Sequence, residues 1–354
     1  MKAIILAGGF GTRLRPLTLH TPKPVVPIFD RPFLNYQIDL LKGVPQIDEI
    51  VLSLNYRSDS IESIIGNGSN EGLSINYTTE PSPLGTGGAI KFCAQDVTET
   101  FLVLNGDVLT HIDLNAVINL HHTRKARATI VLTPVENPNA YGLVQTDSEK
   151  NVINFIEKPD STDLPCNTIN AGIYVMEPET LERIPLNTKY SIERTYFPSL
   201  VKNHEPFVAY IDHGYWLDIG TTEKYVQAHR DILRGKYPAS LQGQSDFSAP
   251  VIHPSATIDP TASLEAPCFI GANVQIGANA HIGANSVIGS SSNIGHDTSV
   301  TGSILWPHCS LAASSSVHDA ILGHSTHVEE HASIHSGVVL GDQSVITAYS
   351  KLTQ

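Results

Sequence analysis

Three glycines and then three basic side chains lie near the start of the chain, where residues 8–24 contain Gly8, Gly9, Gly11, Arg13, Arg15 and Lys23. Glycine lets a backbone turn sharply and come close to a ligand, and successive free N–H groups form a concavity that binds anions. A guanidinium and an ammonium beside such a turn suit a polyphosphate. No Gly-Lys-Ser/Thr follows, and Leu14 stands where a dinucleotide-binding loop has its third glycine. The stretch therefore predicts a phosphate-binding loop of another kind.

Two aspartates are the candidate metal ligands. Asp107 follows the apolar run 101–104 in Asn-Gly-Asp, and Asp218 lies in Trp-Leu-Asp-Ile-Gly. Mg²⁺ often takes only one or two protein carboxylates, together with phosphate oxygens and water. Such a metal, with cations beside it, would serve a reaction at a phosphate group.

The phosphate loop resembles the motif G-G-x-G-T-R-L-x-P-x-T, with a downstream K-P, of the sugar nucleotidyltransferases. Residues 8–18 and 23–24 fill every position of it. The resemblance implies that Arg13 binds the β- and γ-phosphates, that Lys23 reaches the α-phosphate, and that Asp107 and Asp218 hold Mg²⁺. The residues expected to bind the nucleotide are Leu6, Ala7, Gly8, Gly9, Gly11, Thr12, Arg13, Glu80, Gly85 and Asp107.

The resemblance also implies a site for a sugar 1-phosphate. Lys158, in Glu-Lys-Pro, matches the lysine that holds the phosphate of the sugar. Glu157 and the amide of Asn170 match groups that bond sugar hydroxyls, and Gly142 lets the chain pass close to the sugar.

The choice of base is expected to depend on a second glycine run, residues 80–88, with Gly85 as the backbone contact. The ionised carboxylate of Glu80 only accepts hydrogen bonds. Guanine offers two adjacent donors, N1–H and the 2-amino group, whereas uracil and thymine offer one donor between acceptors. Glu80 therefore favours guanine, and an exposed loop glutamate is the alternative.

The elements that must position these residues alternate. Apolar runs at 3–7, 49–54, 73–77 and 101–104 predict strands, and helical spacing over 32–42, 58–65 and 222–234 predicts helices. Such alternation favours an α/β fold with a Rossmann-like, mixed and mostly parallel sheet, and ligands bind beyond the carboxyl ends of such strands. We expect a nucleotidyltransferase domain over residues 1–234, with alternating strands over 128–155 as its sugar-binding lobe.

The C-terminal part is periodic. After a linker at 235–250, aliphatic residues recur every six positions from Ile252 to Val300. This period predicts a three-sided parallel β-helix over 251–354, and its resemblance to hexapeptide-repeat proteins implies a left-handed coil. The register is expected to break after Trp306 and to resume at Leu322, through an irregular coil or a protruding loop.

The combination of both parts most resembles the mannose-1-phosphate guanylyltransferase family. That resemblance implies transfer from GTP to mannose 1-phosphate, and a homo-oligomer assembled through the β-helix. Thymidylyl-, uridylyl- or adenylyltransferases of glucose 1-phosphate and a heptose-phosphate guanylyltransferase are alternatives. An acyltransferase β-helix that uses its histidines, or a non-catalytic regulatory relative, are others.

Composition excludes some classes of partner. The net charge is −13, with no basic stripe, which argues against nucleic acid and anionic membranes. The four cysteines have no zinc spacing, and no apolar run is long enough for a signal peptide or a membrane span. A cytoplasmic protein with free thiols is expected.

Overall fold

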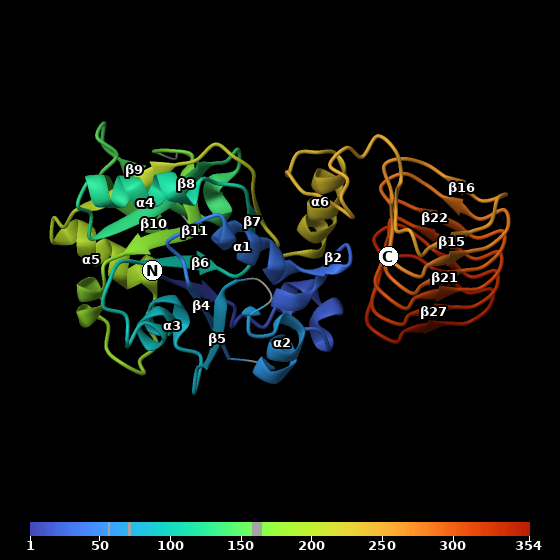
Figure 1. The fold of residues 1–354 in the computed structure, drawn as a ribbon, viewed down its shortest axis with the longest axis horizontal. Helices are drawn as coiled ribbons and strands as arrows, with labels where there is room; N and C mark the ends of the chain where they lie inside the picture. The colour runs from blue at the N-terminus through green and yellow to red at the C-terminus, as the bar shows by residue number, and fades with distance from the viewer. Residues whose placement is uncertain (56, 70–71, 158–164) are drawn as a thin grey trace. The chain divides into compact units, whose positions relative to one another are not determined.

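The computed structural model describes residues 1–55, 57–69, 72–157 and 165–354. The chain forms two compact units (Figure 1). The first contains residues 1–10 and 34–218, and the second contains residues 11–33 and 219–354. This division does not follow the linker expected at 235–250. Residues 11–33 and the helix that starts at 222 belong to the same compact unit as the β-helix.

The first unit is built around one mixed sheet. One half of this sheet consists of parallel strands in the order β6-β1-β4-β5. The strands are β1 (Lys2–Leu6), β4 (Glu49–Leu54), β5 (Ser74–Thr79) and β6 (Phe101–Asn105), and the helices between them are α1 (Phe33–Lys42), α2 (Ser58–Ile65) and α3 (Gly85–Cys93). Strands β1, β4 and β6 are apolar and mostly buried, as expected for a sheet covered on both faces, whereas the edge strand β5 is more polar and buries only Ile75. The predicted strands and helices of this half are confirmed within two residues.

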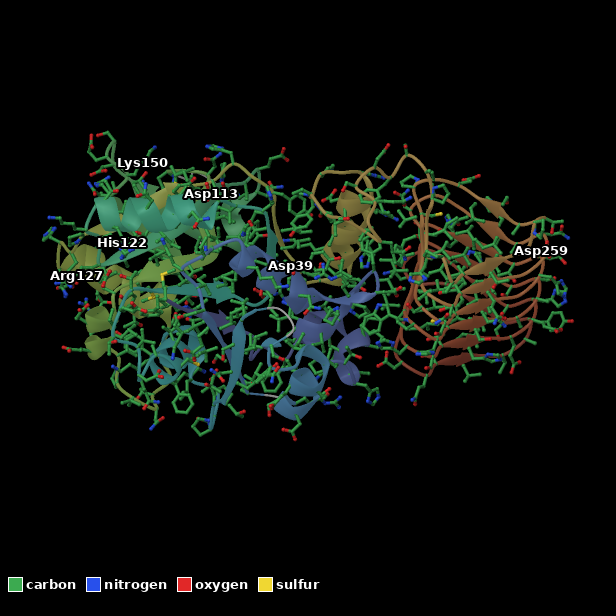
Figure 2. All side chains as sticks on the ribbon, viewed as in Figure 1. Asp39, Asp113, His122, Arg127, Lys150 and Asp259 are labelled. Atoms are coloured by element: carbon green, nitrogen blue, oxygen red, sulfur yellow. The ribbon has the colours of Figure 1, made fainter. Side chains whose placement is uncertain are left out.

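The other half of the sheet is largely antiparallel. Strand β11 (Thr168–Met176) joins it to β6, and the order continues through β9 to β10, with β8 and β12 on a branch. The remaining elements are β7 (Val108–Thr110), α4 (Leu114–Thr123), β8 (Ala128–Pro134), β9 (Gly142–Thr146), β10 (Val152–Glu157), α5 (Phe197–Lys202), β12 (Phe207–Ile211) and β13 (Trp216–Asp218). Figure 2 marks Asp113, whose carboxylate accepts from Ala116 N–H and caps α4. The predicted α/β class with a mixed sheet is confirmed.

The β-helix has three faces, each a parallel sheet of six short strands (Figure 1). The first face has β14 (Val251–Ile252), β17 (Phe269–Ile270), β20 (Val287–Ile288), β23 (Ile304–Leu305), β26 (Ile321–Leu322) and β29 (Val339–Leu340). The second has β15 (Thr257–Ile258), β18 (Gln275–Ile276), β21 (Asn293–Ile294), β24 (Ser310–Leu311), β27 (His327–Val328) and β30 (Val345–Ile346). The third has β16 (Ser263–Leu264), β19 (His281–Ile282), β22 (Ser299–Thr301), β25 (Ser316–His318), β28 (Ser333–Ile334) and β31 (Lys351–Leu352).

The aliphatic residues of the hexads stack inside the prism, as predicted. Ile270, Ile276, Ile282 and Ile288 belong to one buried cluster, whereas Ile252, in the first coil, is 41% exposed. Polar residues make the corners: Asp259, on the outer edge in Figure 2, accepts from the N–H and the hydroxyl of Thr261.

The expected irregular coil is confirmed, but the place of the break was wrong. Within the described residues 251–354 no loop protrudes at this point, and the in-register residue is Leu305 rather than Trp306. Two corners are each one residue short, between β22 and β23 and between β25 and β26, because Val300 to Leu305 and Val317 to Leu322 span five positions. Gly302 and Asp319 stack at these corners, since a Cβ on Gly302 would meet the Asp319 side chain.

The same unit contains the phosphate-loop segment and α6 (Thr222–Leu233). Short helical turns at Thr12–Leu14, Leu17–Leu19 and Lys23–Val25 lead into a hairpin of β2 (Pro27–Ile28) and β3 (Arg31–Pro32). Arg230 of α6 binds Asp319 at one short corner, with 2.8 Å between Nη2 and Oδ1. None of the helices in the described ranges is long and apolar enough to cross a membrane.

Candidate functional site

The predicted site residues belong to both compact units, and each group is described within its own unit. In the first unit, the carboxyl ends of β1 and β6 are adjacent, because the strands pair in parallel. The N–H of Gly106 donates to the carbonyl of Leu6 at 2.9 Å, and a Cβ on Gly106 would lie 2.6 Å from that oxygen. A side chain at Gly106 is therefore excluded, and the start of the phosphate loop lies directly beside Asn105-Gly106-Asp107.

Asp107 and Asp218 come together through a two-stranded ladder. Strand β13 pairs antiparallel with β7, and Asp218 lies opposite Val108, the residue after Asp107. Both aspartates are half-buried. Carboxylate oxygens are the hard donors that Mg²⁺ prefers, and two of them together with substrate oxygens could hold such an ion. No group of three or more potential ligands gathers among the residues that the structure describes.

Glu80 is buried and is held from both sides. Its side chain is 8% exposed, one oxygen accepts from the hydroxyl of Ser53 at 3.0 Å, and the other accepts from Leu84 N–H at 2.8 Å. It is therefore not the exposed loop glutamate of the alternative interpretation. A carboxylate offers about four acceptor positions, so acceptor capacity remains on both oxygens.

The second glycine run starts helix α3 instead of forming an open loop. Gly85 has a φ of +68°, and a Cβ there would lie 2.9 Å from the carbonyl oxygen of Tyr190. The N–H groups of Gly87 and Gly88 donate to that carbonyl at 2.9 and 3.2 Å. Residues 188–192 pack so close to the start of the helix that only glycine fits at these positions. This packing holds the turn at 80–85 in place.

Three of the four candidate sugar residues lie on neighbouring strands. Gly142 pairs with Glu157 across β9 and β10. The pairing of Ile169 with Leu143 puts Asn170 beside Gly142 on the other side. Lys158, which continues β10 in sequence, lies outside the described residues.

The amide of Asn170 is oriented by two bonds within β11. It donates to the hydroxyl of Tyr174 at 2.9 Å and accepts from Gly172 N–H at 2.9 Å. The pairing of β11 with β8 is irregular between Asn170 and Tyr174. Complete burial raises the pKa of Tyr174 well above its usual value, so its hydroxyl stays protonated.

The second unit contains Gly11, Thr12, Arg13 and Lys23. Gly11 has a φ of +62°, and a Cβ there would lie 2.9 Å from Cβ of Lys23. The hydroxyl of Thr18 donates to Gly11 O at 2.7 Å. Lys23 is 8% exposed, whereas Arg13 is exposed. The loop therefore closes tightly on the stem of Lys23 and presents the Arg13 guanidinium to solvent.

Sequence reasoning missed two asparagines at strand ends of the first unit. Asn55, after β4, lies against Gly8, and a Cβ on Gly8 would be 3.2 Å from its Nδ2. Asn105 ends β6 and lies against Gly172. The Oδ1 atoms of both are buried without a hydrogen-bond partner in the described part of the chain. Their only sequence signal is a polar residue directly after an apolar strand.

The C-terminal histidines are dispersed over the β-helix. The His324 ring packs against Trp306, with ring centroids 4.9 Å apart, and the backbone N–H of His324 donates to Oδ1 of Asp342. The His331 ring stacks on Tyr349. Among the described residues, these histidines belong to no group of three or more potential metal ligands.

Both parts of the chain are similar to known families. The model of the nucleotidyl transferase family matches residues 2–235. The model described as the left-handed β-helix (LbH) domain of EIF2B subunit epsilon matches residues 252–352.

Curated relatives match this chain over more than two thirds of its length and of their own. A mannose-1-phosphate guanylyltransferase of Mycobacterium tuberculosis is 39% identical over 261 residues, covering 73% of this chain and 71% of that protein. Mannose-1-phosphate guanylyltransferase 1 of Arabidopsis thaliana is 38% identical, with 68% of each chain covered.

Solved structures share the fold of the catalytic part. HddC of Yersinia pseudotuberculosis, in complex with GMP-PN, is 30% identical, with a TM-score of 0.55 over 64% of this chain and 97% of its own. A Bacillus anthracis structure described as a putative glucose-1-phosphate thymidylyltransferase has a TM-score of 0.59 at 23% identity, covering 64% of this chain and 93% of its own. At that identity the likeness concerns the fold alone.

Proposed function

The chain belongs to the nucleotidyl transferase family, and we propose that it transfers GMP from GTP to mannose 1-phosphate. A phosphate oxygen of the sugar phosphate attacks the α-phosphorus of GTP. The bond from that phosphorus to the bridging oxygen of the β-phosphate breaks, and pyrophosphate leaves with the electron pair. The products are GDP-mannose and pyrophosphate. The names of the curated relatives support the choice of substrates.

One observation carries the chemistry: the β7–β13 ladder brings Asp107 and Asp218 together beside the ends of β1 and β6. In our proposal these carboxylates hold Mg²⁺, which, when bound, neutralises charge on the phosphates. Arg13 binds the β- and γ-phosphates, and Lys23 binds the α-phosphate, where negative charge develops in the transition state. The backbone of Leu6, Ala7, Gly8, Gly9, Gly11 and Thr12 lines the nucleotide.

Guanine is read, in this proposal, by Glu80 and by the backbone at Gly85. The bonds from Ser53 and Leu84 orient the carboxylate before any ligand arrives, so little conformational entropy is lost when it accepts from N1–H and the 2-amino group. A uracil or thymine presents an acceptor to one of those oxygens, and that contact is repulsive.

Gly142, Glu157, Lys158 and Asn170 bind the sugar phosphate in the proposal. The strand order β10-β9-β11 supports this grouping for three of them, because it makes Glu157, Gly142 and Asn170 neighbours. Lys158 holds the phosphate group, while Glu157 and Asn170 bond the hydroxyls of the sugar.

The enzyme is proposed to be a cytoplasmic homo-oligomer. Support for the compartment comes from the four cysteines, which are all free, three of them buried. Burial raises the pKa of Cys93 to about 11 and those of Cys268 and Cys309 to about 12, so these thiols stay protonated and resist oxidation. The β-helix is the proposed assembly surface, and sedimentation would measure the subunit number.

Pyrophosphate release tests the reaction. GTP, ATP, UTP, CTP and dTTP are each combined with mannose, glucose and N-acetylglucosamine 1-phosphates in the presence of magnesium. A maximum at GTP with mannose 1-phosphate supports the proposal. A maximum at dTTP or UTP with glucose 1-phosphate would keep the transfer chemistry and refute the role of Glu80.

A further inference from the structure

The hairpin that follows Lys23 has an unusual tip. It joins β2 to β3, and Phe29 at its tip has a φ of +56°. A bulky side chain rarely adopts this conformation, because its Cβ comes too close to the following carbonyl oxygen. Contacts within the second unit stabilise this conformation. The N–H of Phe29 donates to Nε2 of His229 at 3.1 Å, and the centroid of the Phe29 ring lies 5.0 Å from the ring centroids of His229 and Phe269.

The next residue of the hairpin binds the β-helix directly. Oδ1 of Asp30 accepts from the backbone N–H of Ser290 at 3.0 Å, and Oδ2 accepts from the Ser290 hydroxyl at 2.6 Å. Both oxygens of a half-buried carboxylate thus engage one residue of the β-helix. Charge-assisted, two-point contacts of this kind fix direction as well as distance.

A third contact crosses from the hairpin through α6 to the β-helix. The hydroxyl of Tyr225 donates to the carbonyl of Pro27 and accepts from Nε1 of Trp306, the latter at 2.8 Å. Trp306 and Tyr225 are fully buried. The indole that falls outside the hexad register is therefore used to hold the hairpin.

The segment before Lys23 is tied to the same β-helix. The hydroxyl of Thr21 donates to Oδ2 of Asp342 at 3.2 Å. The other oxygen of Asp342, Oδ1, accepts from the backbone N–H of His324 at 2.9 Å. Pro16 packs on the last coils, since a Cβ on Gly341 would lie 3.3 Å from its Cβ. Lys23 lies between two anchored points, Thr21 and the hairpin.

We infer that the β-helix positions the triphosphate-binding segment of its own chain, with Ser290 and Asp342 as positioning residues that act through Asp30 and Thr21. The inference rests on the proposed function, in which Gly11, Arg13 and Lys23 bind the triphosphate. A cation placed with precision lowers the barrier more than a mobile one, because its binding geometry is already formed. The β-helix is then more than an assembly scaffold: it completes the leaving-group site.

Conservative variants of the full-length protein test this. Thr21→Val and Ser290→Ala each remove a hydroxyl and little volume, and the double variant combines them. Ser310→Ala is the matched control, because Ser310 lies on β24, on another face of the β-helix. The measurements are calorimetric binding of magnesium pyrophosphate, KM for GTP and for mannose 1-phosphate, and amide hydrogen exchange in residues 11–26.

We expect the double variant to bind pyrophosphate about 10-fold more weakly and to have a KM for GTP raised by a similar factor. The KM for mannose 1-phosphate should change less than about 2-fold, exchange in residues 11–26 should be faster, and Ser310→Ala should match wild type. Unchanged pyrophosphate affinity and exchange in the double variant would overturn the inference, as would wild-type protein that does not bind pyrophosphate. If the wild type binds pyrophosphate but makes no GDP-mannose, the proposed substrates fail, and the binding and exchange measurements still decide the role of the β-helix.

Discussion

Asp218 lies beside Asp107 because it ends a strand that pairs with the strand starting at Val108. The two aspartates are thus adjacent on paired backbone although 111 positions of sequence separate them. This relationship makes a direct prediction. Asp107→Asn keeps the shape of the side chain but removes the charge that would bind a divalent ion. Loss of several kcal/mol of transition-state stabilisation corresponds to a fall in kcat of about 100-fold or more.

Steady-state kinetics and thermal unfolding of Asp107→Asn and Asp218→Asn would check this. Asp113→Asn is the matched control, because asparagine caps a helix about as well as aspartate. Both site variants should retain the wild-type melting temperature. Activity at the wild-type level in either would remove that aspartate from the metal site.

Glu80→Gln should change which nucleotide is used. An amide replaces one acceptor oxygen by a donor, so the contact with the two guanine donors is lost and a contact with uracil becomes possible. Hydrogen bonds to charged groups contribute about 1.5–3 kcal/mol, so kcat/KM for GTP should fall by about 10- to 100-fold relative to UTP.

Competition between GTP and UTP measures this ratio. Glu149→Gln, at an exposed turn after β9, controls for the loss of one negative charge. Equal losses of kcat/KM with GTP and UTP would mean that Glu80 does not read the base. Its role would then be to hold the turn at Leu84 through its hydrogen bonds to Ser53 and Leu84.

Two glycines of the phosphate loop region should respond in opposite ways. Gly106→Ala introduces a Cβ that would lie 2.6 Å from Leu6 O, and relieving such an overlap typically costs 1–3 kcal/mol of stability, about the effect we expect here. At Gly9 no atom of the described residues, apart from its two chain neighbours, lies within 4 Å of an added Cβ. Gly9→Ala should fold normally and bind nucleotide more weakly, because it adds a methyl group to the loop that is proposed to line the nucleotide.

Urea unfolding and nucleotide binding of the two variants distinguish the effects. A stable Gly106→Ala protein would mean that β1 and β6 can separate at their ends. Wild-type nucleotide affinity in Gly9→Ala would place the phosphates elsewhere.

His229 makes the stability of the second unit depend on pH. Complete burial lowers the pKa of His229 to about 4, while the bond to Tyr225 O opposes this. The neutral ring is needed, because Nδ1–H donates to Tyr225 O and Nε2 accepts from Phe29 N–H. Since the pKa in the unfolded chain is about 6.5, the unfolded state binds more protons between pH 6.5 and 4. The contribution is complete above pH 6.5 and is lost as pH falls, by about 2 kcal/mol at pH 5.

Urea unfolding at pH 7 and pH 5 measures this loss. Burial also lowers the pKa values of His121 and His324, so the comparison must isolate His229. His229→Gln, which cannot be protonated, should show a smaller loss than wild type by about 2 kcal/mol. His122→Gln, at an exposed position on α4 (Figure 2), should keep the wild-type loss. The same pH dependence in His229→Gln and wild type would contradict the assignment.

The sequence by itself determined the elements whose signal is local. The apolar run before Gly8 predicts β1, the spacing after Pro32 predicts α1, and the six-residue period predicts the three-sided β-helix. Each pattern reports which side of its own segment is buried, and neighbouring residues suffice to define that side. The motif of the phosphate loop also identified its family from residues 8–24 alone.

Only the tertiary structure decided how distant segments meet. Gly85, Gly87 and Gly88 form the first turn of α3, because residues 188–192 pack closely against it. Trp306 is buried outside the hexad register because Tyr225 binds it. The grouping of residues 11–33 with the β-helix depends on contacts such as Asp30 with Ser290, which are 260 positions apart. No local periodicity encodes such a pair, because its energy exists only after both partners are folded and the entropy of closing the chain between them has been lost.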